Sequence, residues 1–170
     1  MAYFSDLTFY SYGGDGEPGT KNIGWLQRRH EFAKAVPSED TLDLLWDFCK
    51  APVMQARGFH LCDLCGPSQA ILAVRNGIEL RLGNAEIRVF SQQSDRSRLL
   101  QDLREAESGG LLFLRKSTVP CNVYAAPTLI YHYVHTHHYK PPDEFLRALT
   151  QGPKPSSEQY SDLLEKLDLE

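Results

Sequence analysis

The sequence predicts an α+β fold, in which helices pack on one side of a small antiparallel sheet. Two observations predict it. Residues 71–90 read as three short strands separated by turn formers, and apolar and charged side chains alternate in the second and third. These strands are flanked by segments with helical features, two of which are residues 38–50 and 127–138. Runs of strands and helices in this order are typical of the α+β class.

The N-terminal part of the chain holds two short strand signals and one helix signal. Residues 7–12 and 22–26 read as strands, joined by a glycine-rich loop. Ser38 is a favourable N-cap, and the apolar residues after it recur at helical spacing as far as Cys49. We therefore expect a helix that begins after Ser38 and buries Cys49 as a small apolar side chain.

The central segment predicts a meander of three antiparallel strands. Asn76-Gly77 is the strongest two-residue signal for a hairpin, and Gly83-Asn84 marks a second turn. Charged side chains occupy alternate positions of the second and third strands, at Glu79, Arg81, Glu86 and Arg88. This alternation predicts that the four charges lie on a solvent-facing side of the sheet and pair across strands.

Further helices are predicted in the second half of the chain. Residues 91–110 read as a polar helix, followed by a buried strand at 111–114. Pro127 suits the first turn of a helix that runs to about His138. The pair Pro141-Pro142 then ends that helix and begins a shorter one.

A last amphipathic helix is predicted near the C-terminus. It begins at a capping box, Ser156-x-x-Gln159, after a link rich in glycine and proline. We expect a single domain over residues 1–150 and this helix as a C-terminal element within residues 151–170.

Composition and charge restrict the classes of protein to which the chain can belong. It has 170 residues, a formal net charge of -4 and a pI near 5.9. An acidic chain argues against nucleic-acid binding, which calls for a basic face. No segment reaches the roughly 20 apolar residues of a membrane span, and the first residues lack the features of a signal peptide. We therefore expect a cytoplasmic protein, in which a Cys-x-x-Cys pair serves metal or redox chemistry.

One pair of cysteines forms half of a candidate metal site. Cys62 and Cys65 are separated by two residues and followed by Gly66. This spacing lets both thiolates face one ion, while backbone amides of the tight turn donate to the sulfurs. Structural zinc takes four ligands in a tetrahedron, so a second pair of ligands is needed.

Histidines near the end of the 127–138 helix are the candidate second pair. His132 and His137 have a spacing found in Cys2His2 sites. On an ideal helix, residues five apart diverge by about 140°, so their rings converge only if the last turn loosens. His135 and His138 are rivals as ligands. His60, close to the cysteines, is either a ligand or a donor of a hydrogen bond to a thiolate.

Two other interpretations of these residues compete with a metal site. A redox pair would precede a helix in a βαβ unit, whereas this pair precedes Gly-Pro and strands. Unrelated core residues without a metal are the second interpretation. The spacing favours one structural Zn²⁺ per chain, held by Cys62, Cys65, His132 and His137, with His135 and His138 exposed.

Two segments carry a family signal: Arg57-Gly58-x-His60-x-Cys62-x-x-Cys65, and the stretch from Tyr124-Ala125-Ala126-Pro127 to Pro141-Pro142. With shorter patches at 3–7, 22–26 and 85–89, they resemble a family of small uncharacterised bacterial proteins. The resemblance implies that His132 and His137, which match the recurring histidines of that family, are the ligands. It also implies an insert at about residues 91–118. It implies no activity.

The predicted site favours a non-catalytic role. A catalytic zinc keeps one position open for water, whereas two cysteines and two histidines close the tetrahedron. We therefore expect a protein that acts through protein–protein interaction. One hypothesis is a bacterial immunity protein whose acidic face matches a basic toxin. A zinc-dependent hydrolase with an open site near His60 is the alternative, and a nucleic-acid-binding zinc module is a further one.

Overall fold

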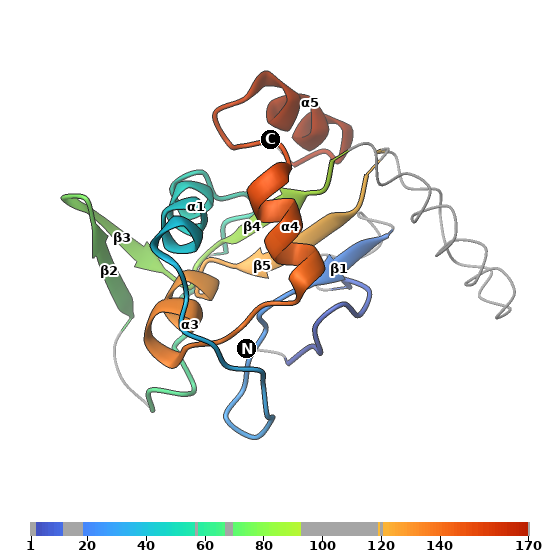
Figure 1. The fold of residues 1–170 in the computed structure, drawn as a ribbon. Coiled ribbons are helices and arrows are strands. Elements are labelled where there is room, and N and C mark those ends of the chain that lie inside the picture. The colour runs from blue at the N-terminus through green and yellow to red at the C-terminus, as the bar shows by residue number, and fades with distance from the viewer. Residues whose placement is uncertain are drawn as a thin grey trace, which may run out of the picture.

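The computed structural model describes residues 3–11, 19–56, 58–66, 70–92, 119 and 121–169. Its strands form two separate sheets (Figure 1). One sheet has the order β1 (Thr20–Asn22), β5 (Val123–Pro127), β4 (Glu86–Phe90), with β1 parallel and β4 antiparallel to β5. The other is an antiparallel hairpin of β2 (Ile71–Arg75) and β3 (Ile78–Leu82).

The described helices are α1 (Glu39–Lys50), α3 (Ile130–His137), α4 (Asp143–Gln151) and α5 (Glu158–Lys166). Figure 1 shows α4 lying across the three-stranded sheet, and α1 contacts α3, α4 and β4. The main core therefore lies between the helices and one face of the sheet. The predicted α+β class is confirmed.

Helix α1 forms as its sequence predicts. The side chain of Ser38 accepts a hydrogen bond from the backbone N–H of Thr41, and two acidic residues occupy the first turn. The apolar stripe from Leu42 to Cys49 is buried. Cys49 is a core thiol, as expected, and burial raises its pKa to about 12.

The predicted three-stranded meander is wrong in its third strand. The hairpin of β2 and β3 turns at Asn76-Gly77 as expected, but β4 pairs with β5 instead of β3. The cause lies in Gly83, whose φ of +99° turns the chain away at the end of β3. The N–H of Gly83 donates to the Thr128 hydroxyl over 2.9 Å, which directs the chain toward β5.

The prediction of four solvent-facing charges holds only for β3. Glu79 and Arg81 are exposed, but Glu86 is 6% and Arg88 0% exposed. The second face of the three-stranded sheet is covered by the N-terminal segment, which places Tyr10 over it. Arg88 donates to Glu86 over 2.8 Å, within one strand rather than across two. The alternation of charges on β4 therefore marks a buried ion pair.

The N-terminal strands and two helix starts also differ from the prediction. Of the strand predicted at 7–12, residue 12 lies outside the described residues and Phe9 forms a single bridge. Of the strand predicted at 22–26, Asn22 ends the regular strand β1 and Trp25 forms a single bridge. Pro127 ends β5 and does not begin α3, because the pairing of β4 with β5 extends to it. The cap of α5 is Ser157, whose side chain accepts from the backbone N–H of Tyr160.

Helix α5 packs on the main core through Tyr160. Its ring lies against Phe48 of α1 and Phe90 of β4, with ring centroids 5.7 Å and 5.4 Å apart. Its hydroxyl donates to the backbone carbonyl of Arg88.

The helix and strand predicted at 91–114 lie outside the described residues, except for Ser91 and Gln92. The division into 1–150 and 151–170 stays a prediction. No helix in the described ranges has the length and apolar character to cross a membrane.

Candidate metal centre

A tight turn between α1 and β2 presents the two cysteines. The backbone N–H of Cys65 donates to the carbonyl of Cys62 over 3.3 Å, and Gly66 follows with a φ of +97°. Backbone N–H groups of Leu64 and Cys65 also hydrogen-bond to the Cys62 sulfur. The preceding segment is fixed to the end of β3, because the N–H of His60 donates to the carbonyl of Gly83 over 2.7 Å. We refer to residues 62–66 as the knuckle.

His132 lies in the first turn of α3 and His137 is its last residue, and the C-terminal end of the helix is widened. The N–H of His138 donates to the carbonyl of Tyr133, five residues back instead of the usual four. The N–H of Tyr139 donates to the same carbonyl over 3.0 Å. His138 itself has a φ of +56°, which ends the helix. The loosened turn that the His132 and His137 spacing requires is therefore present.

The ligand atoms of Cys62, Cys65, His132 and His137 all lie within 4.8 Å of one another. His137 Nε2 lies 3.3 Å from Cys62 Sγ and 3.2 Å from Cys65 Sγ. His132 Nε2 lies 3.3 Å from Cys65 Sγ and 3.2 Å from His137 Nε2. Zn–S bonds of about 2.3 Å and Zn–N bonds of about 2.0 Å give a tetrahedron with edges of roughly 3.3–3.8 Å. The four residues are thus positioned to bind a metal ion.

The environment keeps both histidines neutral, which is the form that binds a metal. Burial, and then the neighbouring His137, lower the pKa of His132 to about 4. Burial likewise lowers the pKa of His137. The same burial raises the pKa of the Cys62 thiol to about 11. A cation at the centre would reverse that effect, because a coordinated thiol loses its proton.

One polar atom beside the site has no partner of its own. The hydroxyl of Tyr133 is buried and makes no hydrogen bond to any described residue. Its pKa is raised by burial and then by negative charge on Cys62, Asp63 and Cys65, so it lies near the sulfurs. A phenol in this place can donate to a sulfur that a metal has deprotonated. The sequence does not single out Tyr133, because the nearness of its hydroxyl to the sulfurs depends on the packing of α3 against the knuckle.

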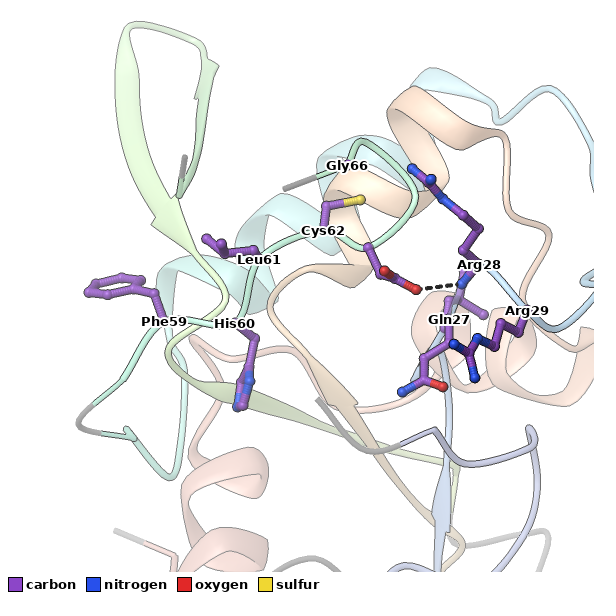
Figure 2. A pocket seen from close by; sticks show the side chains of 10 residues that line it. Gln27, Arg28, Arg29, Phe59, His60, Leu61, Cys62 and Gly66 are labelled. Carbon is purple, nitrogen blue, oxygen red and sulfur yellow. Dashed lines mark hydrogen bonds between the residues drawn. The ribbon is translucent and has the colours of Figure 1, made fainter. Parts of the chain in front are cut away.

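The remaining histidines of the second half lie outside the cluster. His135 is exposed, stacks on Tyr131 with ring centroids 5.8 Å apart and contacts Thr136. His138 is exposed at the helix end. Neither belongs to the four-residue cluster. Of the rival ligands, His60 lies nearest to the cysteines in the sequence, but Figure 2 shows its ring pointing away from the Cys62 sulfur. Its predicted hydrogen bond to a thiolate stays a prediction.

Comparison with known proteins identifies a family but no function. A search of curated proteins and a search of solved structures each gave no match. One family model matches residues 2–100 and 96–150, and its two matched segments meet inside the region predicted as an insert. The recurrence of His132 and His137 among relatives stays a prediction. Because the matched segments span most of the sequence, the chain belongs to the family described as Domain of unknown function (DUF7919).

Proposed function

We propose that this protein is a non-catalytic, zinc-stabilised domain that acts by binding another protein. The observation that carries the proposal is the four-donor cluster of Cys62, Cys65, His132 and His137. Two thiolates and two imidazoles in a tetrahedral arrangement are the donor set and geometry that zinc takes in structural sites. Harder cations such as magnesium and calcium prefer oxygen ligands, which this cluster lacks.

The completeness of the cluster supports a structural role for the metal. Catalytic zinc sites have three protein ligands and keep the fourth position for water or substrate. Four protein donors within 4.8 Å of one another support a closed site, so a zinc-dependent hydrolase is the weaker alternative. The ion would join the knuckle to the end of α3, across the 66 residues between Cys65 and His132. A metal ion that links two distant segments, and so closes a long loop, is expected to stabilise a protein more than one that closes a short loop.

Two helices offer an acidic surface for a partner. Helix α1 carries four acidic residues and one basic residue, and α5 carries three and one. The two helices are neighbours, since Phe48 of α1 packs on Tyr160 of α5. The acidic residues of both helices are exposed: Glu39, Asp40, Asp43, Asp47, Glu158, Asp162 and Glu165. Three of them are in ion pairs, Glu39 and Asp43 with Arg75 and Asp47 with Lys50. A surface of this charge favours a basic partner and disfavours a nucleic acid.

The metal part of the proposal is tested by X-ray absorption at the zinc edge, on protein purified without added metal or chelator. We expect a spectrum fitted by two sulfur and two imidazole ligands. A spectrum with one fewer protein donor and an added oxygen ligand would favour the hydrolase alternative. Protein that contains no zinc, and takes up none on titration, would contradict the proposal.

The binding part is tested by affinity capture from the native host. The bait is the full chain, and the matched variants are Asp162→Lys with Glu165→Lys on α5, and Glu79→Lys on the exposed face of β3. We expect a basic protein that the wild type and the Glu79 variant capture and the α5 variant does not. The narrower immunity hypothesis predicts that this protein is a toxin encoded nearby. Capture that is equal for all three baits would contradict a role for the acidic surface.

A further inference from the structure

A cleft of about 620 Å³ lies beside the knuckle, and Cys62, Asp63 and Gly66 belong to its lining. It is formed by two segments that are far apart in the sequence, residues 26–29 and residues 59–63 (Figure 2). Figure 2 shows Gln27 and Arg29 on one side of the cleft, and Phe59 and His60 on the other. Its volume is in the range of sites for small ligands.

Arg28 fixes the two walls of the cleft to each other. Its backbone N–H donates to Asp63 Oδ2 over 2.8 Å, and its Nη2 donates to the carbonyl of Leu64 over 3.4 Å. The guanidinium thus lies against the knuckle, where a Cβ on Gly66 would come within 3.7 Å of Nη2. One cationic group is held in place at the rim before any ligand arrives.

The charge of the cleft is opposite to that of the whole chain. The chain has a net charge of -4, but the cleft is lined by two arginines and one carboxylate. That carboxylate, Asp63, already accepts the backbone N–H of Arg28. Among the described residues, the guanidinium of Arg29 has no hydrogen bond or ion pair, and that of Arg28 has only its bond to Leu64. Most of the N–H donors of two guanidinium groups therefore remain available.

We propose that this cleft binds a small ligand through an oxyanion, either a carboxylate or a phosphate group. Guanidinium groups present parallel N–H donors that match both oxyanions in a bidentate manner. Gln27 adds an amide at the same side of the cleft. On the opposite side, Figure 2 shows the ring of Phe59 pointing away from Gln27 and Arg29, and the guanidinium of Arg81 lies 3.7 Å from its centroid. The ligand would place its charged group at Arg29.

This inference goes beyond the proposed function and assigns no reaction to the metal. The cleft is shaped by the knuckle, and its cations belong to residues 28 and 29, outside the four-residue cluster. Anion binding is therefore measured on protein as purified, with its metal content recorded in the same sample. If protein that contains zinc binds no anion, the cleft proposal fails while the proposed zinc site stands.

The test is an NMR titration of the full chain with sodium pyrophosphate and, separately, sodium malonate, at constant ionic strength. The signals followed are backbone amides and arginine Nε–Hε groups. We expect saturable shifts confined to residues 26–29 and 59–63 with one of the two probes. Pyrophosphate binding would identify a phosphate ligand, and malonate binding a carboxylate ligand.

Three variants decide whether the cleft is responsible. Arg29→Gln removes the charge of an exposed side chain without a described contact, so folding should be unchanged. Arg29→Lys keeps the positive charge but removes the paired N–H donors of the guanidinium group. The control is Arg147→Gln, an exposed arginine of α4. We expect the dissociation constant to rise at least tenfold in Arg29→Gln, less in Arg29→Lys and not at all in Arg147→Gln. An equal rise of the dissociation constant in Arg29→Gln and Arg147→Gln would overturn the proposal. So would the absence of saturable binding of either probe to the wild type.

Discussion

The Nε2 atoms of His132 and His137 lie 3.2 Å apart, although the two residues are five positions apart on one helix. An ideal helix would send their side chains in directions that differ by about 140°. The widened last turn, in which the carbonyl of Tyr133 accepts from His138 and Tyr139, removes that divergence. The helix end and the metal site are therefore one structural feature, and a change to either should affect the other.

We predict that His132→Ala or Cys62→Ser lowers the free energy of unfolding by more than about 4 kcal/mol, because metal-binding energy at such a site is folding energy. The measurement is urea denaturation of zinc-loaded protein. The matched control is His135→Ala, an exposed histidine of the same helix, which should change stability by less than about 0.5 kcal/mol.

A chelator separates loss of the metal from loss of packing. EDTA should lower the Tm of the wild type and of His135→Ala, but leave the already lowered Tm of Cys62→Ser unchanged. An equal further loss in Cys62→Ser would show that the metal binds elsewhere.

We predict that zinc affinity falls steeply as the pH is lowered from 8 to 6. Without metal the buried Cys62 thiol has a pKa raised to about 11, so it is protonated throughout this range. Its proton must leave when the metal binds, and the apparent affinity should therefore fall at least about tenfold per pH unit. His132, with a pKa lowered to about 4, is already neutral and releases no proton. Competition with a chromophoric chelator measures the slope, and an affinity independent of pH would argue against thiolate ligands.

The four-residue cluster could be predicted from the sequence, but the cleft and the buried ion pair could not. A Cys-x-x-Cys turn and a pair of histidines are local patterns, and metal geometry restricts how they combine. Whether Glu86 and Arg88 face water depends on which segment covers the second face of the sheet. That segment comes from the N-terminus, and its Tyr10 is separated from Glu86 by 76 positions. Alternation along one strand contains no information on such a distant contact.

We predict that Glu86→Gln destabilises the protein by about 3–5 kcal/mol, because it leaves the buried charge of Arg88 without its carboxylate. Glu86 also accepts a hydrogen bond from the Tyr10 hydroxyl over 2.9 Å. In the variant, Arg88 and Tyr10 therefore both lose a charged acceptor. The double variant Glu86→Met with Arg88→Met should cost less than Glu86→Gln alone, since it removes both charges. Urea denaturation measures both.

An exposed ion pair serves as the control for this prediction. Arg75 on β2 contacts Asp43 on α1 over 2.6 Å, and the Asp43 side chain is 53% exposed. Asp43→Asn should have only a small effect, because Arg75 keeps Glu39 as a partner at 2.9 Å and both acidic side chains are open to water. A loss as large as that of Glu86→Gln would show that burial is not what makes the Glu86–Arg88 pair costly to break.

We predict that Gly83→Ala destabilises the protein and weakens its metal site, whereas Gly77→Ala does not affect the metal. Both glycines have a positive φ, +99° and +75°, so each substitution carries a backbone cost of about 1 kcal/mol. Only at Gly83 would the new Cβ meet a backbone atom, the carbonyl oxygen of His60 at 2.3 Å. The segment that leads into Cys62 would have to move, so we expect a further loss of at least about 2 kcal/mol. Denaturation and zinc titration of the two variants, side by side, measure the difference. Equal zinc affinity in both would show that the contact between β3 and the His60 segment does not position the knuckle.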